Sequence, residues 1–363
     1  MCASLVDTAR AQPIADTETT IPINGRLTVT PNENYEAGWL HRAFFGTHWR
    51  DAWTTPVQVQ VIDLKTYAGG LTPTKRGGGM QTKSLRFAGG DGREYKFRSL
   101  DKDPKKVLPK ELQSSIAAKI VQDQISSANP FAPFVVAPLL NAVGVLNAAP
   151  TLVVLPNDPL LGTHRDEFAG LLGIIEEHPS ASEKQDASFA GADKVEGTLD
   201  LFMRFEKRND EAIDARAYLV ARLMDIFLGD WDRHTDQWLW ARVDEGGRSV
   251  WKPIPRDRDQ AFSRFDGLFP WIASHAVPQL EGFRASYPEI ADLTTSGRHS
   301  DRRFLASLDR LTCDSIAQVV AGALTDAVIE NAVRQLPPKS YERDGALRIV
   351  LHEVAVHIDR VEQ

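Results

Sequence analysis

The sequence predicts an α+β fold of two lobes, with a β-rich N-terminal lobe and a mainly α-helical C-terminal lobe. Short segments bounded by turns dominate residues 31–179, whereas longer segments with helical spacing dominate residues 180–363. A run of small and polar residues at 180–193 is typical of a linker or loop and lies at the junction of the two parts. At 363 residues the chain is long enough for one large domain of two lobes. Residues 1–30 are polar and patternless, so we expect them to form a flexible arm.

Glycine-rich turns separate the strands that we expect in the N-terminal lobe. Residues 57–61 alternate Val and Gln, which is typical of a half-buried strand. Glycines at 69–70 and 77–79 flank a basic turn and predict a Gly-rich loop. The loop is followed by two strands joined by the hairpin turn Gly89–Gly92. The remaining predictions are strands at 81–88, 93–100, 151–155 and 168–175, and a helix at 110–126.

The C-terminal lobe begins with a strong helix signal. Apolar residues recur at helical spacing over residues 210–228, and Gly229 is typical of the residue that ends a helix. A hairpin is expected next, with strands at 238–243 and 249–254 around a glycine pair. Further helices are predicted at 301–311, 314–324, 325–336 and 345–361.

The composition excludes several classes of protein. The net charge is -7, from 42 Lys plus Arg against 49 Asp plus Glu, which argues against a general nucleic-acid binder. Two cysteines cannot form a disulfide framework or a cysteine-based metal site. No apolar run is long enough to span a bilayer, and no secretory signal is visible, so we expect a cytoplasmic protein. The start Cys2-Ala3-Ser4 is also typical of a mature lipoprotein, which would place a processed chain in the cell envelope.

Two acidic segments flank the expected hairpin of the C-terminal lobe. The first segment is residues 229–237, and the second is residues 255–262. Because the outer ends of a hairpin's strands lie side by side, Asp232 is expected to lie near Asp257. Two carboxylates and nearby cations suit phosphoryl transfer, which depends on positioning and charge neutralisation.

Both acidic segments resemble those of atypical kinases. Asp232-Arg233-His234-x-x-Gln237 is similar to the Asp-Arg-His-x-x-Asn catalytic loop of this group, above all of the spore-coat CotH kinases. The segment Ile254–Phe262 resembles the metal-binding segment of CotH kinases, and Tyr95–Arg98 resembles the strand that carries a phosphate-gripping lysine. More distantly, the resemblance extends to HipA-type, secretory-pathway and phosphatidylinositol kinases. It covers residues 75–270 and implies a two-lobed protein-kinase-like fold.

The resemblance also implies roles for individual residues. It makes Asp232 the catalytic carboxylate of an ATP-dependent kinase that acts on a hydroxyl acceptor, with a protein as the expected substrate. Mg²⁺ or Mn²⁺ would be held by Asp257, Gln237 and Asp259. The residues expected to contact the nucleotide are Arg98 or Lys96 at the phosphates, Gly78 and Gly79 in the covering loop, and Glu177 in the strand that enters the hinge.

Other interpretations stay open at this stage. Gln237 replaces the expected Asn, and Arg98 replaces the expected Lys, which favours a non-catalytic binding module with a kinase fold. A nucleotidyl transferase on the same fold is a further alternative. The acidic residues could also be loop carboxylates paired with neighbouring arginines. In the N-terminal lobe, Glu111 or Asp123 could pair with the strand cation, or could lie on a solvated helix face.

Overall fold

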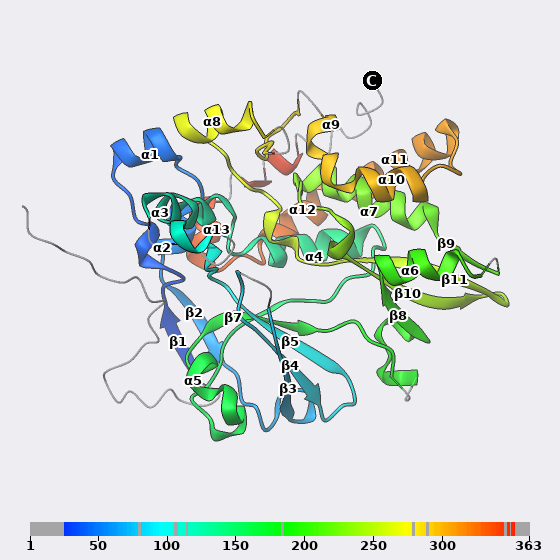
Figure 1. Ribbon diagram of the computed structural model, residues 1–363, viewed down its shortest axis with the longest axis horizontal. Coiled ribbons are helices and arrows are strands. Elements are labelled where there is room, and N and C mark those ends of the chain that lie inside the picture. The colour runs from blue at the N-terminus through cyan, green and yellow to red at the C-terminus, as the bar shows by residue number, and fades with distance from the viewer. Residues whose placement is uncertain are drawn as a thin grey trace, which may run out of the picture.

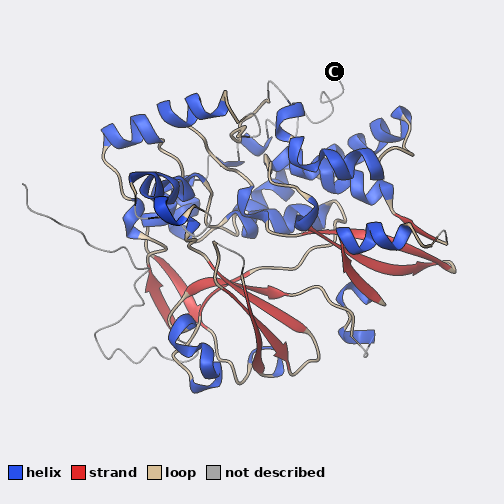
Figure 2. Cartoon of the chain, viewed as in Figure 1, coloured by secondary structure: helices blue, strands red, loops and turns tan. Residues whose placement is uncertain are grey.

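The computed structural model describes residues 25–78, 81–104, 108–113, 115–182, 185–208, 210–277, 280–287, 290–344, 347–348 and 350–352. These residues form two β-sheets and a group of helices. Figure 2 shows the strands of the larger sheet on one side of the molecule and most of the helices on the other. The predicted α+β class, with a β-rich lobe and a helical lobe, is confirmed.

The larger sheet belongs to the N-terminal lobe. Its strands are β1 Arg26–Val29, β2 Val57–Val61, β3 Leu71–Gly77, β4 Ser84–Gly89, β5 Glu94–Ser99, β6 Thr151–Val154 and β7 Leu172–Glu177. Their order is β1-β2-β6-β7-β5-β4-β3, and all neighbours are antiparallel except β2 and β6. In this register Lys96 lies opposite Glu176, and Arg98 lies opposite Ile174.

The smaller sheet belongs to the helical lobe. Its strands are β8 Lys194–Gly197, β9 Glu211–Ile213, β10 Trp238–Glu245 and β11 Arg248–Pro255, in the order β8-β10-β11-β9. The predicted hairpin of β10 and β11 is present, and both strands are longer than expected. Figure 1 shows this sheet beside the larger one, beneath helices α6 and α7.

Helices cover the sheets and form most of the second lobe (Figure 1). Their bounds are α1 Trp39–Phe45, α2 Arg50–Thr54, α3 Ile116–Asp123, α4 Ala132–Ala142, α5 Arg165–Phe168, α6 Thr198–Phe205, α7 Ala215–Leu228, α8 Leu268–Ser274, α9 Ile290–Leu293, α10 Arg298–Phe304, α11 Arg310–Ala323, α12 Asp326–Val333 and α13 Pro338–Asp344. Within the described residues, no single helix has the length and apolarity to cross a bilayer; α11 and α12, bent by 62° against each other, meet that test when taken together.

Helix α7 illustrates how local sequence sets the ends of an element. Its expected start at residue 210 is wrong, because the Asp214 side chain accepts a hydrogen bond from the Ala217 amide at 2.8 Å and caps the helix there. Gly229 ends the helix in a left-handed conformation, with φ of +64°. Both ends therefore follow from single residues, and α7 leads directly into the first acidic segment.

Several expectations for the N-terminal lobe need correction. Residues 26–29 lie in the expected arm but form β1, because their backbone pairs with the free edge of β2. The basic turn around Lys75 belongs to strand β3, which pairs with β4. Helix α4 has no counterpart among the predictions, since its two prolines argue against a helix. Pro133 lies in its first turn, where proline is tolerated, and burial of the helix against both lobes outweighs the cost of Pro138.

Other boundaries also shift. The helix expected at 110–126 is divided into 3-10 helix η4 Lys110–Leu112, α3 and 3-10 helix η5 Gln124–Ser127. The strand expected at 168–175 begins later, as β7, after the short helix α5. Most of the helix expected at 345–361 lies outside the described residues.

The core continues across the two lobes. One cluster of buried side chains joins the inner face of the larger sheet, including Val59 and Ile174, to α4 and α7. A second cluster, including Phe97 and Ile175, covers the outer face of the same sheet. Because side chains alternate along β5 and β7, Lys96, Arg98 and Glu176 point to the inner face, toward the helical lobe.

Candidate active site

The β10–β11 hairpin brings the two acidic segments to one end of the smaller sheet, as predicted. Trp238 lies opposite Pro255, so the chain enters and leaves the hairpin at the same place. The Arg256 amide donates a hydrogen bond to the Gln237 carbonyl at 2.9 Å. The Arg233 guanidinium also joins the segments, because it donates to the Arg256 carbonyl at 2.7 Å and to the Gln237 carbonyl at 3.2 Å.

A buried ionic network lies beneath these segments. Asp225 of α7 is fully buried and accepts contacts from three arginines. It pairs with Arg222 at 2.5 Å, with Arg233 at 3.2 Å, and with Arg258. Asp230 pairs with Arg258 at 3.2 Å and lies 3.9 Å from Arg233. The network therefore ties α7, the first acidic segment and the second acidic segment together.

Asp225 is not among the site residues predicted from the sequence. The signal that could have found it is Asp225 three residues after Arg222, among the apolar residues of α7, because buried acids require cationic partners. Burial alone would raise the pKa of Asp225, but the charges of Arg258 and Arg233 hold it below its ordinary value. Asp225 thus stays ionised beneath the site.

The alternative that all the acids are loop carboxylates paired with neighbouring arginines holds for Asp230 alone. Asp232 instead makes no hydrogen bond to any described residue, and its nearest charged partner is His234 at 3.7 Å. Its side chain is 32% exposed. Burial raises the pKa of Asp232, and the charge of Asp259 raises it further, although His234 acts in the opposite direction. Asp232 is therefore a half-buried carboxylate with free acceptor sites.

Asp257 and Asp259 pair with cations of the other lobe. Asp257 has a left-handed backbone with φ of +50°, and its carboxylate forms an ion pair with Arg98 of β5. Asp259 pairs with Lys102, which follows β5. Burial would raise the pKa of Asp259, but Lys102 and Arg98 hold it below its ordinary value. These two ion pairs bridge the lobes.

The donor atoms of the predicted metal ligands fit a hard divalent cation. Mg²⁺ and Mn²⁺ prefer oxygen ligands, and Asp257, Asp259 and Gln237 supply carboxylate and amide oxygens. The Gln237 Oε1 atom is buried and has no hydrogen-bond partner. Among the described residues, however, no three His, Cys, Asp or Glu side chains gather closely enough to hold a metal ion. In this arrangement both predicted metal carboxylates are instead paired with cations, Asp257 with Arg98 and Asp259 with Lys102.

A cavity of about 40 Å³ lies between β5, the end of β7, α4 and the second acidic segment. Lys96, Arg98, Glu176 and Asp257 line its polar side, and α4 supplies apolar side chains. Burial, together with the charges of Arg98 and Arg256, lowers the pKa of Lys96 to about 7. A volume near 40 Å³ holds roughly one or two waters. The lobes would therefore have to separate before a nucleotide could enter.

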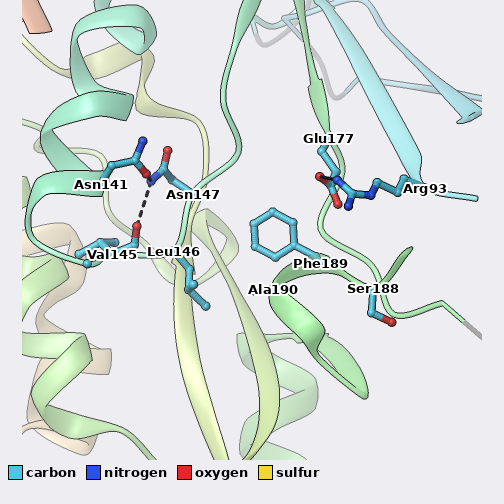
Figure 3. A pocket seen from close by; sticks show the side chains of 10 residues that line it. Arg93, Asn141, Val145, Leu146, Asn147, Glu177, Ser188, Phe189 and Ala190 are labelled. Carbon is cyan, nitrogen blue, oxygen red and sulfur yellow. Dashed lines mark hydrogen bonds and ion pairs between the residues drawn. The ribbon is translucent and has the colours of Figure 1, made fainter. Parts of the chain in front are cut away.

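Two other predicted nucleotide contacts, Glu177 and Gly78, lie apart from this cavity. Glu177 points to the opposite face of the sheet from Glu176, and it pairs with Arg93 at 3.2 Å. Glu177 and Arg93 line a different hollow, of about 370 Å³. Figure 3 shows Asn147 across from them and the Phe189 ring between. Gly78 lies at the turn after β3, where a Cβ would come within 2.1 Å of the Thr82 carbonyl, and Gly79 lies outside the described residues.

Arg98, the cation of β5, pairs with neither Glu111 nor Asp123, the two acids that the sequence offered as its partners. Glu111 is exposed, and Asp123 binds both terminal nitrogens of Arg50 at 2.7 Å. Arg98 instead contacts Glu176 of the adjacent strand at 3.2 Å. Strand pairing explains this choice, because β5 and β7 lie side by side and present both residues on the inner face.

Comparison with known proteins gives matches at the level of structure. No family model matches the chain, and no curated protein sequence matches it. Three solved structures are similar over 80% of this chain. The proinflammatory kinase CtkA of Helicobacter pylori is 13% identical, with a TM-score of 0.40 over 95% of its length. HipA of Shewanella oneidensis MR-1, in a complex with HipB and operator DNA, is 11% identical, with a TM-score of 0.37 over 71% of its length. Rio2 kinase of Chaetomium thermophilum, with ADP, Mg²⁺ and phosphoaspartate, is 11% identical, with a TM-score of 0.34 over 72% of its length.

Proposed function

We propose that this protein transfers a phosphoryl group from ATP, with Mg²⁺ or Mn²⁺, to a hydroxyl group of a protein substrate. One observation carries the proposal: Arg98 of the N-terminal lobe reaches across to Asp257 of the second acidic segment. The cation expected to grip phosphates and the carboxylate expected to hold metal therefore belong to one site. Asp232 lies at the same end of the β10–β11 hairpin as Asp257.

In this mechanism Asp232 orients the acceptor hydroxyl and accepts its proton. Its carboxylate makes no hydrogen bond to the residues that the structure describes, and burial favours the protonated form by raising its pKa. Arg98 and Lys96 would neutralise the phosphates. Asp257, Asp259 and Gln237 would hold the divalent cation, which supplies charge neutralisation when bound. The ion pairs around Asp225 hold the two acidic segments in fixed positions relative to each other.

Nucleotide entry has a structural requirement in this proposal. The ion pairs of Asp257 with Arg98 and of Asp259 with Lys102 would have to be released, because the same carboxylates would bind metal. The cavity of about 40 Å³ would have to widen as well. We therefore expect the metal and the nucleotide to bind together, with phosphate replacing the carboxylates as the partner of these cations.

A thermal-shift titration with ATP, in the presence and absence of Mg²⁺ or Mn²⁺, tests the nucleotide site. The wild type should show a metal-dependent rise in melting temperature, because a ligand that binds only the folded state stabilises it. Asp257→Ala should abolish the rise. Asp210→Ala is the matched control, since Asp210 is an exposed carboxylate paired with Arg208 at 2.6 Å, outside the site. An unchanged shift in Asp257→Ala would show that the metal assignment is wrong.

A transfer assay with labelled ATP then tests the catalytic carboxylate. Asp232→Ala should retain the metal-dependent thermal shift and lose turnover. Mass spectrometry of the labelled product would distinguish phosphate transfer from AMP transfer, which a nucleotidyl transferase on the same fold would give. Full turnover by Asp232→Ala would contradict its role as the proton acceptor.

The second candidate function is a non-catalytic binding module. It is favoured by the lobe-bridging ion pairs, which occupy both predicted metal carboxylates, and by Gln237 and Arg98 at the Asn and Lys positions of the resembled family. ATP binding without turnover by the wild type, on a broad set of protein acceptors, would support this function over the kinase.

A further inference from the structure

Two cations line the small cavity between the lobes without a partner. Lys96 of β5 and Arg256, the residue before Asp257, are both half-buried. Neither side chain makes a hydrogen bond or an ion pair with any described residue, unlike Arg98 beside them. Unpaired cations at half-buried positions are unfavourable, because burial removes part of their hydration.

The acidic residues near this cavity offset these charges only in part. Glu176 and Asp257 line it, and both contact Arg98. Arg258 also lines the cavity, but it is neutralised by Asp225 and Asp230 beneath it. Glu176 acts on the charges of both Lys96 and Arg256, and Asp236 acts on that of Arg256. Among the described residues, however, no carboxylate forms an ion pair with either cation.

The surroundings reinforce this excess of positive charge. Arg86 of β4 and Arg98 lie close enough to both cations to act on their electrostatics. His178 follows β7, lines the same cavity and is 8% exposed. Burial and the charges of Arg86, Arg256 and Lys96 lower the pKa of His178 to about 3, so its ring is neutral at pH 7 and can accept or donate one hydrogen bond. The cavity thus combines two cations that make no ion pair with any described residue and a neutral polar ring.

We propose that Arg256 and Lys96 together form a binding site for a phosphate oxyanion. The planar guanidinium of Arg256 suits two oxygens of one phosphate, and the Lys96 ammonium suits a third as a point charge. In the ATP-dependent function proposed above, on which this assignment rests, the ligand is the polyphosphate of the nucleotide. The same chemistry would bind inorganic polyphosphate. The resemblance to atypical kinases assigned no role to Arg256.

Isothermal titration at pH 6, where Lys96 is charged, with inorganic pyrophosphate, ATP and adenosine tests the site. The variants are Arg256→Met and Lys96→Met, which remove one charge each, and Arg256→Lys, which keeps the charge. Lys252→Met is the matched control, because Lys252 lies on the same strand as the residues leading to Arg256 and pairs with Glu245 at 2.6 Å. Circular dichroism and the melting temperature would show that each variant is folded.

Pyrophosphate and ATP should bind about tenfold to a hundredfold more weakly to Arg256→Met and Lys96→Met than to the wild type, as expected for loss of a charge-assisted hydrogen bond. Arg256→Lys should recover part of the loss, and Lys252→Met should bind like the wild type. Adenosine affinity should be the same in all variants. A uniform loss of adenosine binding would point to a structural effect and contradict the assignment.

The outcomes separate this inference from the proposed function. Pyrophosphate binding that depends on Arg256, without ATP binding, would support the phosphate site and contradict the ATP-dependent function. ATP binding that is equal in the wild type, Arg256→Met and Lys96→Met would contradict the phosphate site, and the ATP-dependent function would then stand with Arg98 as the cation at the phosphates. A wild-type protein that binds neither pyrophosphate nor ATP would overturn both.

Discussion

The buried carboxylate of Asp225 should be worth several kcal/mol to the fold, and Asp225→Asn isolates its charge. Asn has nearly the same shape as Asp, so the substitution removes the negative charge with little change in packing. In the wild type Asp225 contacts Arg222, Arg233 and Arg258, and its own side chain is 2% exposed. Removing this negative charge leaves three buried guanidinium groups with one fewer carboxylate to neutralise them.

The expected magnitude follows from which partners remain. Breaking a buried ion pair by removing one partner costs about 3–5 kcal/mol. Arg222 keeps Asp301 at 2.8 Å, while Arg233 and Arg258 are left to share Asp230. Since each arginine keeps one acidic neighbour, we expect a loss near the lower end, about 3 kcal/mol of the free energy of unfolding.

Urea unfolding followed by tryptophan fluorescence measures this loss. Asp193→Asn provides the comparison, because Asp193 also binds an arginine, Arg242 at 2.8 Å, but its side chain is 57% exposed. That variant should lose less than about 1 kcal/mol, as is usual for surface ion pairs. If Asp225→Asn were as stable as Asp193→Asn, the view that this network stabilises the acidic segments would be refuted.

Two further predictions concern pH. Burial, with the charges of Asp225 and Asp259, raises the pKa of Asp230 to about 6, so the folded state holds a proton that the unfolded state releases near pH 3.8. The stability of the wild type relative to Asp230→Asn should therefore fall as pH rises from 4 to 6 and stay level above that, in urea titrations across this range. The pH dependence expected from Lys96 has the opposite sign. Its pKa is about 7 in the folded state and 10.5 when unfolded, so its charge destabilises the folded state fully below pH 7. Lys96→Met should be more stable than the wild type at pH 6, by on the order of 5 kcal/mol, and the difference should shrink toward pH 10.5; an advantage independent of pH would refute the electrostatic cause.

The stability expected of Lys96→Met bears on function. A substitution that stabilises the protein while it weakens phosphate binding is typical of a site that keeps unfavourable charge for its ligand. In the proposed function the phosphates of ATP would relieve the repulsion between Lys96, Arg98 and Arg256. Thermal stabilisation by pyrophosphate should accordingly be larger in the wild type than in Lys96→Met.

Features that depend on neighbouring residues could be predicted from the sequence. The alternation in Val57–Val61, the turn at Gly89–Gly92 and the glycine that ends α7 are local patterns, and the structure has each element. The convergence of the Asp232 and Asp257 segments was also predictable. It requires only the β10–β11 hairpin, whose two ends must meet wherever the rest of the chain lies.

Features that depend on distant segments were decided by the tertiary structure. A period of two places Lys96 and Arg98 on one face of β5, and only the packing of the lobes selects Arg98 as the partner of Asp257. Helix α4 forms despite its prolines because burial between the lobes outweighs local preference. The pairing of β5 with β7 decides that Glu176, and not Glu177, faces the cavity. Local residues thus determined the elements and their turns, whereas charge pairing and burial across the lobes, which no short segment contains, decided which side chains meet.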